Sequence, residues 1–194
     1  MKSRRNTVFI GGLVLLVGGA ALHPVKDGVK PLVVEHASPA KAGGYRTLAA
    51  DCLWLKTNLA WETKDPVRVR RLIDFTVLAD PEAPYFWLNG ARILAYDFPV
   101  WQCEQEYQAP LAVQNHWRVA GADEALRLLE RGQQWHGKSA ALYLEMANIC
   151  LYALGDRHRA AECYRLASVQ NDAPDYAARI YARLHEEELA GMSR

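Results

Sequence analysis

The chain has 194 residues, of which 51% are apolar, and it carries a formal net charge of +1. This length allows one domain of ordinary size with an appendage, and the apolar fraction excludes a wholly disordered chain. A charge so close to zero gives no electrostatic footprint for nucleic acid, so no nucleic-acid partner is expected.

The first 22 residues have the pattern of a membrane-targeting segment. Three basic residues, Lys2, Arg4 and Arg5, precede an uncharged and largely apolar run over residues 7–22. Because basic residues stay on the cytoplasmic side, the pattern predicts a cytoplasmic N-terminus and a body across the membrane. An uncleaved signal anchor is favoured, although the run is slightly shorter than the about 20 residues that usually span a bilayer. A signal peptide cleaved at the small residues 19–21 is the alternative.

Residues 23–44 follow without a sustained helical period. They contain three prolines and three glycines. Such a composition is typical of a linker that holds a folded body away from the membrane. The folded domain is therefore expected to begin near Tyr45 and to extend to residue 190.

From Tyr45 onward, apolar residues recur with the period of an α-helix. One stripe has spacings of four, three and four residues and consists of Leu48, Cys52, Leu55 and Leu59. Tryptophans at positions 54 and 61 lie on a second face of the same helix. A helix that is apolar over so wide an arc is expected to be covered on two sides.

Two Asp-Pro pairs divide this part of the chain. Asp65 can cap the helix that follows, and Pro66 suits the first turn of that helix. The pair at residues 80–81 is expected to end it, because the residue before a proline avoids helical geometry. The first helical unit is therefore predicted over residues 45–83.

Two later segments carry the signature of a repeated helical hairpin. Residues 87–94 read W-L-N-G-A-R-I-L, with a large aromatic at the start and the small Ala91 where two helices would pack closely. The second segment contains Leu144, Ala147, Asn148 and Leu151, then a Gly155-Asp156 turn, then Ala160, Tyr164 and Ala167. Small residues let two helix backbones approach, and one aromatic fills the space beside them.

These patterns resemble those of the tetratricopeptide-repeat (TPR) superfamily, whose units are helix–turn–helix motifs of 34 residues. Gly90 departs from the family pattern, which has Leu at that position. The resemblance covers roughly residues 45–190 and implies an all-α solenoid of antiparallel helix hairpins. The implied units are about 45–83, 84–137 with an insertion at 98–120, and 138–174, with a capping helix at 175–190.

The chain also resembles membrane-anchored TPR proteins of bacteria. The resemblance rests on the N-terminal pattern, on Y-R-T-L-A-A-D-C-L-W-L over residues 45–55 and on Y-F-W-L-N-G-A-R-I-L-A-Y-D over residues 85–97. It implies the cell envelope as the location. The expected arrangement is a single pass of residues 7–22 through the inner (cytoplasmic) membrane, with the body outside the cytoplasm. Signal cleavage would instead give a periplasmic or secreted protein.

The sequence contains no short motif that specifies catalysis, a cofactor or a metal site. Patterns of the types H-E-x-x-H, G-x-S-x-G, Walker and G-x-G-x-x-G are absent. None of His116, His136 and His158 has a second histidine four residues away, and the four cysteines form no C-x-x-C pair. We therefore expect no catalytic residues, no cofactor and no metal.

Two of the cysteines, Cys150 and Cys163, lie on the two arms of a predicted hairpin. A disulfide between them is permitted if the body lies outside the cytoplasm. The favoured interpretation is that both are small apolar core residues.

In TPR proteins the first helix of each unit lines a concave surface that binds peptides or partner helices. Carried over onto this sequence, the resemblance implies groove positions at Tyr85, Leu88, Arg92, Ala95 and Tyr96 and at Leu142, Glu145, Ile149, Tyr152 and Ala153. Tyrosines mixed with an arginine suit a protein-recognition surface. Arg92 and Ile149 replace asparagines of the carboxylate clamp that some family members use, so chaperone-tail binding is not expected. Trp101 and Trp117 would either pin the insertion to the body or add an aromatic contact surface.

These observations favour a membrane-anchored scaffold or assembly factor that binds envelope or membrane proteins. The alternative is a periplasmic or secreted enzyme, or an enzyme accessory subunit, with a helical body. That alternative predicts a deep pocket that gathers carboxylates or histidines. A third hypothesis, a soluble repeat protein released by signal cleavage, differs from the first only at residues 1–22.

Overall fold

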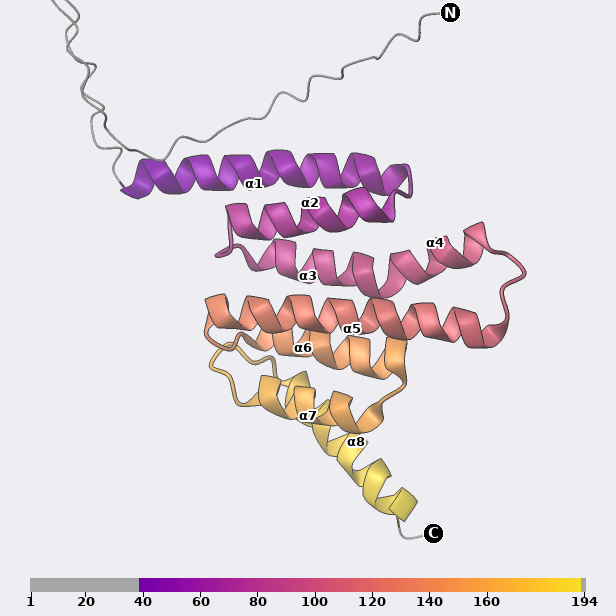
Figure 1. Ribbon diagram of the computed structural model, residues 1–194. Helices are drawn as coiled ribbons and strands as arrows, with labels where there is room; N and C mark the ends of the chain where they lie inside the picture. The colour runs from indigo at the N-terminus through magenta and orange to yellow at the C-terminus, as the bar shows by residue number, and fades with distance from the viewer. Residues whose placement is uncertain (1–38, 193–194) are drawn as a thin grey trace, which may run out of the picture. The chain divides into compact units, whose positions relative to one another are not determined.

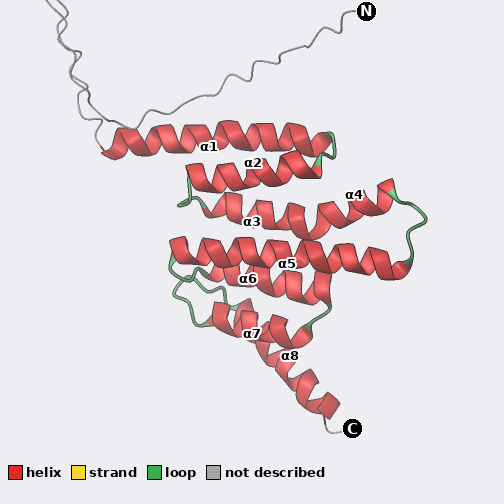
Figure 2. Ribbon diagram, in the orientation of Figure 1, coloured by secondary structure: helices red, strands yellow, loops and turns green. Residues whose placement is uncertain are grey.

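The computed structural model describes residues 39–192, and Figure 2 shows helices joined by turns and short loops throughout this range. No strand occurs among these residues. The prediction of an all-α fold is therefore confirmed. The predicted targeting segment at residues 1–22, and the predicted linker up to residue 38, lie outside the described residues. Within residues 39–192, no helix combines the length and the apolar character needed to cross a bilayer.

The helices pack as successive antiparallel pairs (Figure 1). In chain order they are α1 (Pro39–Glu62), α2 (Pro66–Ala79), α3 (Pro84–Arg92), the π-helical η1 (Ile93–Asp97), α4 (Phe98–Gln105), α5 (Leu111–His136), α6 (Ala140–Asn148), the π-helical η2 (Ile149–Leu154), α7 (Arg157–Ser168) and α8 (Tyr176–Met192). Helix α1 packs on α2, α3 and η1 on α5, α6 on α7, and α8 on α7. The largest fully buried side chains, which include Ile73, Leu129 and Ile149, come from all three pairs.

The first pair begins earlier than the sequence indicated. Helix α1 starts at Pro39, within the predicted linker, instead of at Tyr45. Pro39 occupies the first position of the helix, where a missing N–H has no cost. The predicted boundary between α1 and α2 is confirmed: the Asp65 carboxylate accepts the Arg68 backbone N–H at 3.0 Å, and Pro66 occupies the first turn.

Helix α1 buries only one of its two apolar faces. Ala50, Trp54, Thr57 and Ala60 pack into the body. On the opposite face Leu48, Leu55 and Leu59 are 60–63% exposed, and Cys52 is exposed as well. The expectation that α1 is covered on two sides is therefore wrong within the described part of the chain. Periodicity identifies an apolar face, but the partner helices decide which face is covered. Here they cover Trp54, whose ring centroid lies 5.7 Å from that of Phe86.

Residues 98–120 extend the middle pair and do not form a separate insertion. After α3 the chain continues through η1 into α4, so that one bent helix runs over residues 84–105 (Figure 1). Proline is accepted at position 99 because it lies in the first turn of α4, directly after the π-helical stretch. This helix ends at Gln105, and Pro110 flanks the start of α5. Helix α5 then runs back along the first arm.

The last pair follows the sequence prediction closely. Gly155 has a φ of 70°, a left-handed conformation that favours glycine, and it ends η2. The Asp156 carboxylate accepts the Arg159 backbone N–H at 2.9 Å and so caps α7. On α7, Ala160, Tyr164 and Ala167 are all buried. The Tyr164 hydroxyl donates to Asn148 Oδ1 at 2.8 Å, which ties the two arms of the pair together.

The second helices of the three pairs share one buried pattern. Each buries residues at positions i, i+4 and i+7. These residues are Val69, Ile73 and Thr76 on α2, Ala125, Leu129 and Gly132 on α5, and Ala160, Tyr164 and Ala167 on α7. The same spacing of buried residues therefore recurs in all three second helices.

Gly121→Ala is expected to lower the free energy of unfolding. A Cβ atom at this position would lie 2.5 Å from the Leu94 carbonyl oxygen and 3.1 Å from Pro99 Cγ, and a backbone oxygen cannot rotate away. We expect a net loss of about 1–2 kcal/mol, because overpacking costs about 1–3 kcal/mol and the helix propensity of Ala returns at most about 1 kcal/mol. Urea unfolding followed by circular dichroism measures it. The control Gly44→Ala meets nothing within 4 Å and should not destabilise; equal losses in both variants would contradict the close approach.

Candidate functional site

The predicted groove residues lie on two neighbouring first helices. Tyr85, Leu88 and Arg92 belong to α3, Tyr96 to η1, Glu145 to α6, and Ile149 and Tyr152 to η2. Helix α3 contacts α6, and η1 contacts η2. The structure therefore places the two sets on adjacent helices, as the repeat pattern predicts.

Only some of these residues are accessible to a partner. Tyr85 and Tyr152 are 55% and 69% exposed, and Leu88 and Tyr96 are half-buried. In contrast, Leu142 and Ile149 are fully buried and the Glu145 side chain is 5% exposed. These three positions are corrections to the predicted groove. Their helix contacts α3, α5 and α7, so those positions face the body.

An ion pair links the two first helices. Arg92 Nη2 donates to Glu145 Oε2 at 2.6 Å, and the Arg92 side chain remains 52% exposed. This hydrogen bond raises the pKa of Arg92. A buried carboxylate is costly without a partner, so Arg92 offsets the desolvation of Glu145 and fixes α3 against α6. Arg92 therefore has a structural role in addition to its accessible surface.

A first hollow, the α1-side hollow, lies between α1 and the helix formed by α3 and η1. It has a volume of about 520 Å³ and is lined by Trp54, Asn58, Trp61, Glu62, Tyr85, Asn89, Arg92, Ile93 and Asp97. One hydrogen bond crosses it, from Trp61 Nε1 to Asp97 Oδ2 at 2.7 Å. Two of the predicted groove residues, Tyr85 and Arg92, thus share this hollow with tryptophans of α1.

A second hollow, the α5-side hollow, lies between η1, α4, the start of α5 and η2. It has a volume of about 570 Å³. Its lining comprises Ala95, Tyr96, Pro99, Val100, Cys103, Glu104, Tyr107, Leu111, Gln114, Asn115, Arg118, Tyr152 and Ala153. Apolar and aromatic side chains dominate, with one acid, one arginine and two amides among them. This mixture is typical of a site that binds an apolar group and orients it through a few polar contacts.

The sequence did not identify most of the α5-side hollow. Val100, Tyr107, Leu111 and Arg118 had been assigned to an insertion, whereas they lie on or between the extended arms of the middle pair. The aromatic content of residues 98–120 was the available signal. Of its two tryptophans, Trp101 is buried, with its ring 5.2 Å from Phe98 and 6.2 Å from Trp61, so it pins this segment to the body. The exposed aromatic surface belongs to Tyr107.

Both first helices become π-helical beside the α5-side hollow. The stretches are η1 (Ile93–Asp97) and η2 (Ile149–Leu154), and they contribute Tyr96 and Tyr152 to its lining. π-Helical turns are rare and occur frequently at functional sites. Two such turns side by side therefore single out this hollow among the surfaces of the described chain.

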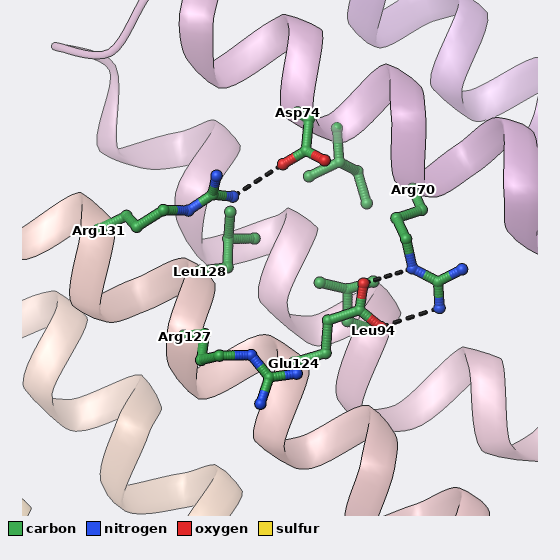
Figure 3. Close-up of a pocket in the computed structure, with 8 residues that line it drawn as sticks. Arg70, Asp74, Leu94, Glu124, Arg127, Leu128 and Arg131 are labelled. Atoms are coloured by element: carbon green, nitrogen blue, oxygen red, sulfur yellow. Dashed lines mark hydrogen bonds and ion pairs between the residues drawn. The ribbon is translucent and has the colours of Figure 1, made fainter.

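A third, smaller cleft of about 290 Å³ lies between the second helices α2 and α5 (Figure 3). Arg70 forms a two-bond ion pair with Glu124, and Arg131 Nη2 lies 2.8 Å from Asp74 Oδ1. Arg127 also lines the cleft and makes no ion pair within residues 39–192. Both acids of the cleft, Asp74 and Glu124, are paired with arginines of the opposite helix. These ion pairs therefore join the first helical pair to the middle one.

The α1-side and α5-side hollows lack the histidine that many hydrolytic and metal sites use. Within residues 39–192, no group of three or more His, Cys, Asp and Glu side chains is placed to hold a metal ion. Cys150 and Cys163 are free thiols, the first buried and the second half-buried. Hydrogen bonding with Cys150, followed by burial, raises the pKa of Cys163.

Arg92→Met is expected to lower the free energy of unfolding by about 1–3 kcal/mol, because it leaves the buried Glu145 carboxylate unpaired. Adding Glu145→Gln removes the buried charge and should recover most of that loss. The control is Arg165→Met, since Arg165 pairs with Glu162 on an exposed surface, where solvent screens the pair and its loss should change the stability little. Equal losses in Arg92→Met and Arg165→Met would contradict the role assigned to Arg92.

Because Tyr96 is half-buried, we expect its ionisation to lower the free energy of unfolding at alkaline pH. Burial, aided by the negative charge of Glu145, raises the pKa of Tyr96 from 10 to about 12. The folded protein therefore holds this proton more tightly than the unfolded chain, and the stabilisation is complete below pH 10 and lost as the pH rises to 12. In Tyr96→Phe the melting temperature should fall less steeply across this range. Tyr107→Phe, which alters an exposed ring, should follow the unmodified protein.

No protein-family model matches the chain, and no curated protein matches it. The residues of the two hollows and the pattern of the sequence are therefore what indicates a function.

Proposed function

We propose that this chain is a membrane-anchored scaffold or assembly factor of the bacterial cell envelope, whose TPR-like body binds a protein partner. The observation that carries the proposal is the α5-side hollow. It is apolar, open to a partner and bordered by tyrosines from two successive first helices, Tyr96 and Tyr152.

Three features support a TPR-like body. The second helices of the three pairs bury the same i, i+4, i+7 stripe. The last pair turns at Gly155 and Asp156, where the family pattern has its turn between helices. The first helices of the last two pairs lie side by side with their π-helical stretches in contact. Stacked hairpins of this kind bury a continuous core and leave the surface of the first helices for partners.

The lining of the α5-side hollow indicates the kind of partner that suits it. Val100 and Leu111 offer apolar contacts, and the rings of Tyr107 and Tyr152 are largely exposed. Gln114 and Asn115 supply amide donors and acceptors beside them. We therefore propose a peptide segment or helix that inserts one or two apolar side chains and is oriented by polar contacts at the rim.

The membrane part of the proposal rests on residues 1–22. The basic tip followed by the uncharged run at residues 7–22 favours a single-pass anchor in the inner membrane, with the body outside the cytoplasm. Carbonate extraction and the intact mass of the mature chain distinguish this anchor from a cleaved signal peptide. If carbonate releases the chain and its mass shows that residues 1–22 are missing, the protein is secreted and not anchored.

A photoreactive phenylalanine at Tyr152 should crosslink a defined membrane or envelope protein in living cells. This position borders the α5-side hollow and is exposed, so the probe should not disturb the core. The matched control is the same probe at Phe75 on α2, which is also exposed but does not line the hollow. Crosslinked species are identified by mass spectrometry of the membrane fraction.

The variant Val100→Arg gives the second control. Val100 is 53% exposed, so a charge is tolerated by the fold but disfavours an apolar group in the hollow. It should reduce the Tyr152 crosslink at least severalfold while leaving the melting temperature nearly unchanged. The proposal fails if Tyr152 captures no protein, or if it captures the same proteins as Phe75 with no effect of Val100→Arg.

A further inference from the structure

We propose that two copies of this chain pair through the exposed apolar face of α1, with the two α1 helices parallel. The face consists of Tyr45, Leu48, Cys52, Leu55 and Leu59 and is called the α1 outer face below. Trp54 and Trp61 of the α1-side hollow lie on a different side of α1, whereas Glu62 of that hollow follows Leu59 in the same row. The inference is independent of the proposed scaffold function.

The α1 outer face has the residue spacing of a two-stranded coiled coil. From Tyr45 to Leu59 the spacings are three, four, three and four residues, which is the alternation of a and d positions in the heptad repeat. Tyr45, Cys52 and Leu59 then occupy a positions, and Leu48 and Leu55 occupy d positions. In parallel dimers, Ile or Val at a together with Leu at d favours two strands; this face has leucines at both d positions, with Tyr, Cys and Leu at the a positions.

The body of the protein leaves this face free by geometry. Ala50 and Thr57 are fully buried against the body, and in the same heptad numbering they fall at f positions, directly opposite the a and d seam. The three leucines of the outer face remain 60–63% exposed. Monomeric proteins seldom leave a continuous row of leucines in water, and such rows mark interaction surfaces.

The charges that flank the face select a second copy in parallel orientation. Asp51 is at a g position and Lys56 at the following e position; both are exposed and neither makes an ion pair within residues 39–192. In a parallel pair, g of one helix faces the e position five residues later in the other. Asp51 of each copy then meets Lys56 of the other, giving two equivalent ion pairs. An antiparallel pair would place g against g and e against e, and would not join these charges.

The length of the face is sufficient because the helix is already formed. Isolated helices of two heptads are marginal in water, since helix formation itself opposes pairing. In this protein α1 is held as a helix of 24 residues by its packing on α2. The two copies therefore gain the burial of the leucines without ordering α1, which is the advantage of a preorganised surface.

Cys52 gives a direct readout, because equivalent residues of a parallel pair meet at the interface. The two thiols should be joined by a short bis-maleimide, which alkylates one thiol at each end. With the full chain in native membranes, we expect a species with the mass of two chains on a denaturing gel. The species should vanish with Cys52→Ser and should decrease at least tenfold with Leu55→Lys. Leu189→Lys changes an equally exposed leucine on α8 and should leave it unchanged.

A charge exchange tests the orientation. Each single variant, Asp51→Lys or Lys56→Asp, places two like-charged pairs across the interface. Each should weaken association of the full chain in detergent on the order of tenfold, as measured by sedimentation. The double variant restores both ion pairs and should regain the original association. All four proteins should melt at similar temperatures when dilute, because these side chains do not contact the core.

Three outcomes would overturn the inference. If the full chain sediments as a monomer and Cys52 reacts with maleimide, the α1 outer face is unpaired. If the full chain sediments as a monomer and Cys52 does not react, residues 1–38 of the same chain cover the face. A dimer that survives Leu55→Lys is formed by another surface. If the double charge variant associates as weakly as the single variants, the two α1 helices are not parallel.

Discussion

The structure depends on how closely the two long arms of the middle pair approach each other. Helix α5 lies against η1 at Gly121, where a Cβ atom would come 2.5 Å from a backbone oxygen, and against α3 at Gly132, where a Cβ atom would come 3.1 Å from the Trp87 ring. At Gly121 a Cβ atom could not be placed without a shift of the backbone, and at Gly132 the Trp87 ring would have to move by a few tenths of an ångström. Helix α5 also contacts α6 and η2, so the same arm joins the middle pair to the last pair.

The α5-side hollow is a consequence of the length of this middle pair. Helix α4 and the first part of α5 continue past the other helices of the stack (Figure 1), and η2 stops at Gly155. The overhang leaves one side of the long hairpin uncovered, where Val100, Leu111 and Tyr152 line the resulting space. The Arg92–Glu145 ion pair fixes the two first helices that border it. An ion pair with a buried carboxylate and close helix packing together hold this shape, so we expect little rearrangement on binding.

Helix α1 combines two surfaces with different roles. Trp54 and Ala50 attach it to the body, and the opposite row of leucines stays in contact with solvent. In the proposed arrangement the hollows and the α1 outer face would act together, so that each pair of chains carries two equivalent binding sites. Paired sites raise the affinity for a partner that is itself repeated or confined to a membrane, since the second contact becomes intramolecular.

Local chemistry determined much of this fold from the sequence alone. Asp65, Pro66, Gly155 and Asp156 set helix ends through bonds to neighbouring residues, and the buried residues of α7 follow from the spacing of small residues and one aromatic. Tertiary packing decided the rest. It buried the Trp54 face of α1 and left the leucine stripe exposed. It also placed residues 98–120 in two long helices and buried Ile149. A helical period indicates that a face is apolar. Which of two apolar faces is buried, and where distant segments form a hollow, depends on tertiary contacts that a single sequence does not show.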